Sequence, residues 1–248
     1  MTAKPPAFIK RIGRSLADFL LPPVCLVCGD DTDGNFLCAK CFSLIQTVER
    51  SFCQLCGQPL RISRHSYICP ECVKHPLALH RIRTWAIFTH PLDKLVYAFK
   101  YSNFKKLALF FSRQLALIIQ NDANLRDAEM LIPIPIHFLK KWWRGYNQTE
   151  ILGKVLSERC GIPMFDALKR IKLTRTQTKL SVSQRQSNLA HAFKHKKTIS
   201  VRNKKVIVLD DVITSGATMD AAAEVLLEAG AAQVYGLSIG GAWIKRSS

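Results

Sequence analysis

The stretch 205–218 constrains the fold more than any other part of this chain. It begins with an apolar run, Val206–Leu209, in which three residues are β-branched, a pattern typical of a strand buried on both faces of a parallel sheet. Two carboxylates follow, Asp210 and Asp211, and a predicted helix, Met219–Ala229, lies further along. A helix N-terminus placed after a strand offers free backbone N–H groups and the positive end of the helix dipole, so this unit predicts an anion site. The intervening loop is small and hydroxylated and comprises Thr214, Ser215, Gly216, Ala217 and Thr218.

The same stretch lacks the two commonest phosphate-loop patterns, GxxxxGK[ST] and GxGxxG. At every position it instead resembles the signature of the type I phosphoribosyltransferases: a hydrophobic strand, two acidic residues and a T-[ST]-G-x-T loop. The resemblance implies that residues 214–218 bind the 5′-phosphate of phosphoribosyl pyrophosphate (PRPP). It also implies that Asp210 and Asp211 hold the ribose hydroxyls as part of a catalytic set, with Mg²⁺ on the pyrophosphate. The alternative is an ordinary buried strand capped by a Ser/Thr turn.

The composition sets the remaining limits. With 248 residues, 48% of them hydrophobic, the chain is long enough for one large or two smaller domains. The formal net charge of +18 favours polyanionic partners: nucleic acid, an anionic membrane surface or a pyrophosphate-bearing substrate. We find no secretory signal and no run of eighteen apolar residues, so we expect a cytoplasmic protein without a transmembrane segment. In such a protein, nine cysteines indicate metal ligands before disulfides.

Eight of the cysteines form four CxxC pairs within 48 residues. Each pair turns both sulfurs toward one centre, and two pairs complete a closed tetrahedral zinc site with four cysteine ligands. Because such a site has no open position, we predict a structural role for two zinc ions. Sequential grouping is the simplest arrangement, and an interleaved cross-brace stays open as an alternative. The predicted ligands are Cys25, Cys28, Cys38 and Cys41 for one ion and Cys53, Cys56, Cys69 and Cys72 for the other.

The N-terminal segment 8–21 has apolar residues on one helical face and basic residues opposite. Such a helix either docks on its own domain, which we favour, or lies on a membrane, which would place the protein at its inner face. A strand is predicted at 84–89, and we place the end of the zinc module just before it. The predicted organisation is therefore an amphipathic helix at 1–24, a double zinc ribbon at 25–80 and a phosphoribosyltransferase-like domain at 81–248.

A second informative stretch, 132–150, leads into a helix that Asn147 and Glu150 are expected to cap. Its basic and aromatic residues crowd the end of a predicted strand, where ligands bind in doubly wound sheets. They suit pyrophosphate or the bases of a nucleic acid. The alternative is a solvated basic turn whose tryptophans cover the core. We assign Arg144 to the catalytic set, and assign to nucleic-acid binding Lys140, Lys141, Trp142 and Trp143.

A wider resemblance joins these stretches. The P-[ILV]-P motif at 133–135 and the R-G-[FY]-N-Q motif at 144–148 are similar to those of the ComF family (ComF/GntX-like proteins), and the match continues through 170–193 to the anion loop. The resemblance implies an α/β fold with a type I phosphoribosyltransferase-like doubly wound parallel sheet, preceded by a small zinc-ribbon module with four cysteines per zinc. It also implies a role in natural competence, beside helicase-like and single-strand DNA-processing proteins.

The segment 167–209 contains no acidic residue and twelve Lys or Arg. In type I phosphoribosyltransferases the corresponding segment closes over pyrophosphate and excludes water, which implies that Arg175 and Arg185 contact PRPP. A charge run of this kind is otherwise a solvated face. Because twelve positive charges exceed what one pyrophosphate requires, we infer a second polyanion, single-stranded DNA. It would bind in a basic groove with the aromatic faces of Trp142, Trp143 and Tyr146.

Only nine residues follow the last predicted strand, 233–239, so we expect no C-terminal hood of the kind that selects a nucleobase. Two functions fit these features. The first is a PRPP-binding protein of natural competence that acts in the uptake and processing of single-stranded DNA in the cytosol. The second is an active Mg²⁺-dependent phosphoribosyltransferase of nucleotide or nucleoside metabolism with an unidentified acceptor. The missing hood and the ComF resemblance favour the first.

Overall fold

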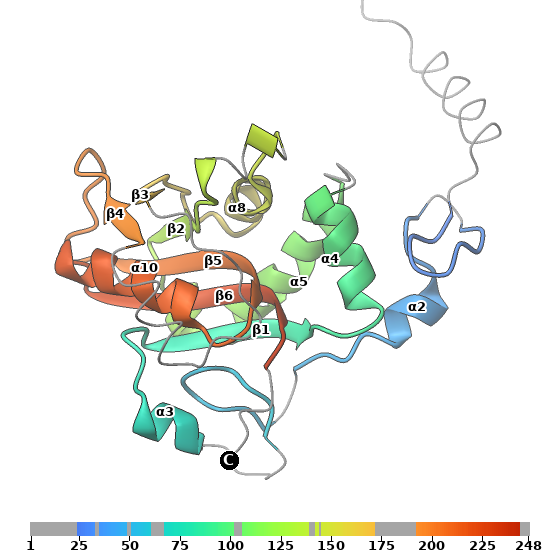
Figure 1. Cartoon of the computed structure of the whole chain (residues 1–248), viewed down its shortest axis with the longest axis horizontal. Coiled ribbons are helices and arrows are strands. Elements are labelled where there is room, and N and C mark those ends of the chain that lie inside the picture. Colours follow the sequence, from blue (N-terminus) through green and yellow to red (C-terminus); the bar gives the residue numbers. More distant parts are fainter. Residues whose placement is uncertain are drawn as a thin grey trace, which may run out of the picture.

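The computed structural model describes residues 24–32, 35–48, 51–60, 67–101, 106–138, 142–143, 145–171 and 192–243. Its centre is a four-stranded sheet in which neighbouring strands are parallel throughout (Figure 1). The strands lie in the order β1-β6-β5-β2 and are β1 (Arg81–Ile87), β2 (Met130–Pro133), β5 (Lys205–Ile213) and β6 (Gln233–Gly241).

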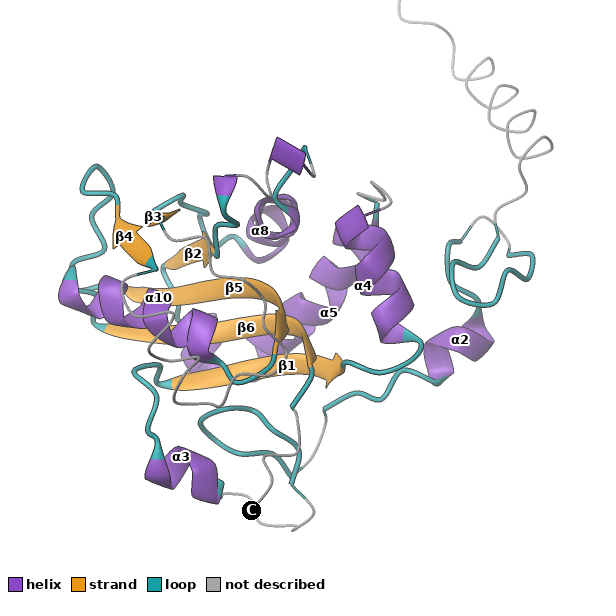
Figure 2. Cartoon of the chain, in the orientation of Figure 1, coloured by secondary structure: helices purple, strands orange, loops and turns teal. Residues whose placement is uncertain are grey.

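Helices cover both faces of this sheet, as parallel strands require (Figure 2). One face carries α4 (Leu92–Tyr101), α5 (Leu107–Asn121), the short α6 (Ala123–Arg126) and α8 (Gln148–Cys160). The other face carries α10 (Ala217–Glu228). The arrangement confirms the predicted α/β fold with a doubly wound parallel sheet.

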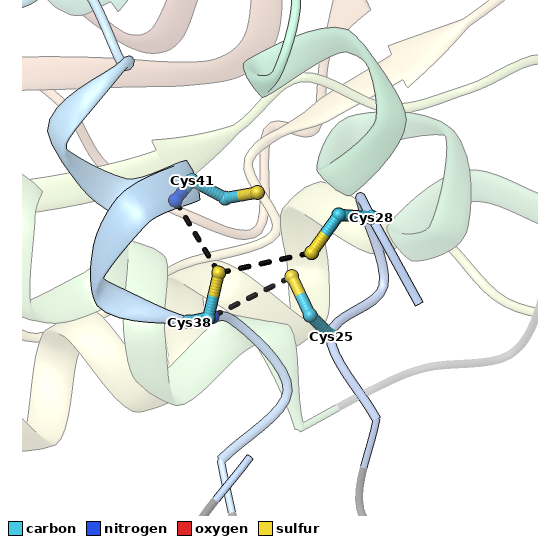
Figure 3. Close-up of side chains that lie close together, drawn as sticks. All are labelled: Cys25, Cys28, Cys38 and Cys41. Carbon is cyan, nitrogen blue, oxygen red and sulfur yellow. Dashed lines mark hydrogen bonds between the residues drawn. The ribbon is translucent and has the colours of Figure 1, made fainter. Parts of the chain in front are cut away.

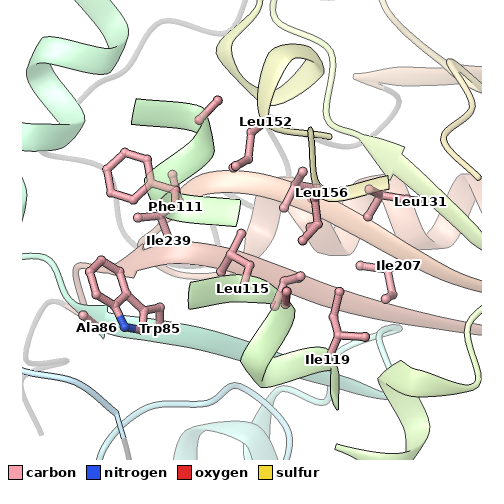
Figure 4. Close-up of a cluster of buried hydrophobic side chains, with 14 of the residues drawn as sticks. Trp85, Ala86, Phe111, Leu115, Ile119, Leu131, Leu152, Leu156, Ile207 and Ile239 are labelled. Atoms are coloured by element: carbon pink, nitrogen blue, oxygen red, sulfur yellow. The ribbon is translucent and has the colours of Figure 1, made fainter. Parts of the chain in front are cut away.

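Alternation along β5 separates two hydrophobic cores. Ile207 and Leu209 join the cluster under α5 and α8, whereas Val206 and Val208 join the cluster under α10. All four side chains are fully buried. The continuous apolar run in the sequence therefore reflects a strand that is covered on both faces. Figure 4 shows the first cluster, where side chains of α5 and α8 meet those of the strands, among them Leu115, Ile119, Leu152, Leu156, Ile207 and Ile239.

The first cysteine-rich segment, with α2 (Ala39–Ser43), packs against the hydrophobic cluster under α4, α5 and α8. The rings of Phe36 and Phe42 approach that of Phe110 in α5 edge-on, with ring centroids 5.6 and 6.1 Å apart. The chain then continues beside β1, where Val48 N donates to Trp85 O at 2.9 Å. This antiparallel contact covers the outer edge of β1, an edge that would otherwise offer unpaired backbone groups.

The second cysteine-rich segment, with α3 (Pro70–Lys74), lies against β1 itself (Figure 1). The guanidinium of Arg83 is buried at this junction and donates to Asp122 Oδ2 at 2.8 Å and to Gln54 O at 3.2 Å. Burial lowers the pKa of Arg83, and the nearby Asp122 carboxylate opposes that shift. The hydrogen bond to Gln54 therefore ties this cysteine-rich segment to β1, and the salt bridge joins β1 to the end of α5.

A small antiparallel ladder joins β3 (Leu168–Arg170) to β4 (Phe193–His195) beyond β2. Ile171 N donates to Ala192 O at 2.9 Å, so the two ends of the intervening segment are held together. That segment, 172–191, lies outside the described residues and includes Arg175 and Arg185. The segment predicted to close over pyrophosphate, 167–209, is thus partly strand, in β3, β4 and the start of β5, and its closure stays a prediction.

Several element boundaries differ from those expected. The strand predicted at 206–209 extends from Lys205 to Ile213, because pairing with β6 continues from Asp210 opposite Ser238 to Ile213 opposite Gly241. Both acidic residues therefore lie inside β5. The helix predicted to begin at Met219 starts two residues earlier.

The predicted domain limits and the role of the helix at 8–21 stay predictions, and that helix lies outside the described residues. Among the helices that the structure describes, none combines the length and apolar character needed to span a bilayer.

Candidate anion site and four-cysteine centres

The anion loop, residues 214–218, leaves the carboxyl end of β5 and begins α10. Gly216 is the N-cap of that helix and has a left-handed backbone with φ of 81°, which favours glycine. As a glycine it has no side chain that could cap the N–H groups of the first turn. One of these groups, Ala217 N, donates to Ser215 Oγ at 3.4 Å. The first turn of a helix has N–H groups without intrahelical partners. The loop therefore has the features of a helix-terminal anion site.

The two carboxylates of β5 have different surroundings. Asp211 is 5% exposed and accepts hydrogen bonds from Lys100 Nζ at 2.8 Å and from Gln148 Nε2. Its partners come from α4 and α8, so it points to the face that those helices cover. Asp210 is partly accessible and accepts from Asp211 N at 2.8 Å. Because side chains alternate along a strand, Asp210 points to the opposite face, toward α10.

Asp210 and Asp211 also differ in their electrostatic surroundings. Burial, and then the charge of Asp211, raises the pKa of Asp210 to about 7, although its own hydrogen bond from Asp211 N and the nearby Lys100 and Arg170 oppose the shift. Burial disfavours the charge of Lys100, yet attraction to Asp211 raises the pKa of Lys100 above its ordinary value. Asp211 thus belongs to a buried ion pair, and Asp210 is the carboxylate that remains accessible to a ligand.

Three residues near this pair had no assigned role in the sequence. Gln148 and Arg170 stood in the motifs of the ComF resemblance, which marked them without indicating a function. The guanidinium of Arg170, in β3, lies over the ring of Phe193 at 5.4 Å and is attracted to Asp210. Lys100 carried no signal, because a lysine in the last turn of an amphipathic helix is usually solvated. Only the fold brings it to Asp211.

The residues before α8 hold that helix against the end of β2. Asn147 caps α8 as predicted: its side chain accepts from Thr149 N at 3.2 Å and pairs with Glu150. Asn147 Nδ2 and Thr149 Oγ1 both donate to Ile134 O. Tyr146, which we expected among the aromatic faces for nucleic acid, instead donates its hydroxyl to Phe99 O at 2.6 Å. These bonds fix the place from which Gln148 reaches Asp211.

The two tryptophans of the second stretch are strongly exposed. Trp142 and Trp143 are 80% and 88% exposed, which rules out the alternative that they cover the core. Contiguous exposed apolar surface marks sites of interaction, and two adjacent exposed indole rings offer such surface. The basic residues assigned beside them, Lys140, Lys141 and Arg144, lie outside the described residues. Their assignments stay predictions.

The eight predicted metal ligands form two groups in the sequential order. Within each group the four Sγ atoms all lie within 4.8 Å of one another. In the first group, Cys38 N donates to Cys25 Sγ at 3.5 Å and Cys41 N to Cys38 Sγ at 3.4 Å (Figure 3). In the second, Cys69 N donates to Cys53 Sγ at 3.3 Å. The chain therefore has two four-cysteine sites whose all-sulfur donor sets suit zinc.

The glycines after two of the CxxC pairs have a left-handed backbone, which favours glycine. Gly29 and Gly57 have φ of 81° and 71°. A Cβ on Gly57 would also lie 2.8 Å from Ile82 O, so this turn has no room for a side chain. The sequential grouping of the cysteines excludes the interleaved cross-brace, which the sequence had left open.

Metal analysis of the purified chain should return about two zinc ions per molecule. The pairwise substitutions Cys38→Ala/Cys41→Ala and Cys69→Ala/Cys72→Ala should each reduce that number to about one, because the groups share no ligand. Loss of both ions on disruption of either group would contradict two independent sites.

Comparison with known proteins agrees with this structure. The family model named double zinc ribbon domain matches residues 16–73, and the phosphoribosyl transferase domain model matches residues 149–237. With the parallel sheet and the two four-cysteine sites, these matches define a phosphoribosyltransferase-like protein that carries an N-terminal double zinc ribbon.

Three relatives narrow the class. DNA utilization protein YhgH of Shigella flexneri is 31% identical over 204 residues, which cover 80% of this chain and 87% of that protein. Competence protein F of Haemophilus influenzae is 31% identical over 215 residues, covering 82% and 90%. Competence protein ComFC of Bacillus subtilis is 25% identical over 202 residues, covering 79% and 80%. The chain belongs to the ComF family.

Proposed function

We propose that this chain is a phosphoribosyltransferase-like competence protein, which binds PRPP with Mg²⁺ and handles single-stranded DNA in the cytoplasm. The observation that carries the proposal is the anion loop at the end of β5, beside an accessible carboxylate, in a chain whose relatives are named for competence and DNA utilization. Those names favour DNA handling over an enzyme of nucleotide or nucleoside metabolism.

The proposed PRPP site uses three kinds of group. The N–H groups of residues 214–218 bind the 5′-phosphate, since they meet an anion at the positive end of α10. Asp210 accepts from the ribose hydroxyls, and the Lys100–Asp211–Gln148 network holds the strand in place beside it. Mg²⁺, when bound with PRPP, neutralises charge on the pyrophosphate. Arg144, Arg175 and Arg185 complete the site as further pyrophosphate contacts.

The proposed DNA surface centres on Trp142 and Trp143. Exposed aromatic rings stack on the bases of a single strand without regard to sequence, and basic side chains track its backbone. The net charge of +18 supplies the long-range attraction. Helicase-like and single-strand DNA-processing proteins are the partners that such a role requires.

Binding to a labelled oligothymidine strand across a salt series tests the DNA part of this function. The logarithm of the association constant should fall linearly with the logarithm of the salt concentration. The Trp142→Ala/Trp143→Ala variant should bind about tenfold or more weakly, because each stacked base contributes about 1–3 kcal/mol. Leu117→Ala, which removes an exposed apolar side chain of α5, is the control and should bind like the native chain. A flat salt dependence, or native affinity in the tryptophan variant, would sink the proposal.

A further inference from the structure

The second four-cysteine centre (Cys53, Cys56, Cys69 and Cys72) is joined to the anion loop through β1. Ile82 N, in β1, donates to Leu55 O at 2.6 Å, and Leu55 lies inside the Cys53–Cys56 knuckle. The side chain of Ile82 is fully buried and extends toward the loop. A Cβ placed on Gly216 would lie 3.4 Å from Ile82 Cδ1, which is ordinary contact distance. The side chain of Ile82 therefore lies beside the anion loop, and the backbone of the same residue is hydrogen-bonded between Cys53 and Cys56.

A second connection follows the chain as it leaves this centre. Leu77 packs against the four thiols, and its Cδ1 is 3.9 Å from the position of a Cβ on Gly216. The next residue, Ala78, donates its N–H to Asp220 Oδ1 at 2.7 Å. Asp220 lies in the first turn of α10 and is 7% exposed. The exit from the zinc centre is thus bonded to the turn that follows the anion loop.

The chemistry of Asp220 indicates a positioning role. A carboxylate in the first turn of a helix would repel a phosphate bound at the same helix end, so attraction of the ligand does not explain it. Burial raises the pKa of Asp220, and the hydrogen bonds from Ala78 N and Leu79 N oppose that shift. A buried carboxylate is costly unless it is hydrogen-bonded. The hydrogen-bond donors to Asp220 are backbone N–H groups of the segment that leaves the second centre. This explains why an aspartate stands at this position.

The first four-cysteine centre offers an internal comparison. Its neighbouring apolar residues, Leu26 and Phe36 among them, pack into the cluster under α4, α5 and α8. Among the described residues outside the loop and its helix, those within 4 Å of a Cβ placed on Gly216 are Ile82 of β1 and Leu77, and Asp220 accepts from Ala78 N. The two zinc ribbons therefore differ in their access to the anion loop.

We propose that the second four-cysteine centre, acting through Leu77 and Asp220, positions the anion loop, so that the loop holds its ligand-binding conformation only while that centre is intact. Asp220 is a positioning residue, and the first centre has no such effect. The consequence for PRPP rests on the proposed function, whereas the consequence for the conformation of the loop does not.

Hydrogen exchange of the amides in residues 212–222 tests the conformational part without any ligand. Asp220→Ala should raise the exchange rate of these amides about tenfold, because the first turn of α10 loses its tether. Asp220→Asn should restore native rates, since the amide oxygen can still accept from Ala78 N. Cys69→Ala/Cys72→Ala should act like Asp220→Ala, and Cys38→Ala/Cys41→Ala should leave these amides unchanged. Native rates in Asp220→Ala would overturn the proposal.

Calorimetric titration with Mg²⁺–PRPP tests the consequence for binding. The affinity for Mg²⁺–PRPP should fall about tenfold in Asp220→Ala and in Leu77→Ala, because a small displacement of a binding group weakens ligand binding strongly. It should be close to native in Asp220→Asn. All three variants should keep two zinc ions. An equal loss of affinity in Asp220→Asn and Asp220→Ala would contradict a hydrogen-bonded tether at Asp220. If the native chain does not bind Mg²⁺–PRPP, the proposed function fails, and the exchange rates still decide this inference. If the cysteine variants do not fold, Asp220→Ala and Asp220→Asn still decide it.

Discussion

Replacing Lys100 with methionine should lower the free energy of unfolding by about 3 kcal/mol. Methionine keeps the length and the apolar stem of lysine but leaves Asp211 buried without its cation, and breaking a buried ion pair on one side costs about 3–5 kcal/mol. Lys100 itself is partly accessible, which places the expected effect at the lower end. Urea denaturation followed by far-ultraviolet circular dichroism measures it. Lys94→Met, at an exposed position of the same helix, should change the stability by less than about 0.5 kcal/mol.

A double-mutant cycle separates the ion pair from simple loss of packing. Asp211→Asn removes the buried charge and leaves an amide that Lys100 and Gln148 can still contact. The combined Lys100→Met/Asp211→Asn variant should therefore be more stable than the sum of the two single losses predicts. Strict additivity would show that Lys100 contributes through its stem alone.

Local patterns in the sequence predicted those parts of the fold that depend on neighbouring residues. The run 206–209 predicted a strand because burial on both faces leaves no polar position to interrupt it. The CxxC spacing predicted both four-cysteine groups, since a knuckle is a local turn. Asn147 and Glu150 predicted the start of α8 for the same reason.

The remaining features of the site depend on residues far apart in the sequence. Lys100 and Asp211 are separated by more than a hundred residues, and nothing near Lys100 distinguishes it from a solvated lysine. The different surroundings of Asp210 and Asp211 follow from the length of β5. A strand that ended at Leu209 would leave both carboxylates in a loop, whereas continued pairing with β6 sends them to opposite faces.

Tertiary contacts also decided the roles of the aromatic residues. Trp142, Trp143 and Tyr146 were grouped because they stand together in the sequence. In the structure Tyr146 is tethered to Phe99, and the two tryptophans are left exposed. Burial of an aromatic ring depends on what the rest of the fold places over it, and five residues of sequence do not contain that information.

The largest expected effect on ligand binding comes from Asp210. Asp210→Asn should weaken Mg²⁺–PRPP binding about a hundredfold or more in calorimetric titration, because hydroxyl groups bond about half as strongly to a neutral amide oxygen as to a carboxylate. It should leave two zinc ions and the stability close to native, since Asp210 is outside the Lys100–Asp211–Gln148 network. Native affinity in this variant would remove Asp210 from the site.

The pH dependence of that binding gives an independent reading of the same carboxylate. The pKa of Asp210 is about 7 in the free protein, so its charge is present above that pH and is lost as the pH falls through it. Affinity should therefore decline below about pH 7 in the native chain, by up to tenfold per pH unit. PRPP titrates as well, and the Asp210→Asn variant isolates the contribution of PRPP to the pH dependence because it lacks the carboxyl group.

In a naturally competent strain that carries this chain in place of its own competence protein F, the Asp210→Asn variant should lower the transformation frequency. Normal transformation by a variant that no longer binds PRPP would separate the pocket from DNA handling.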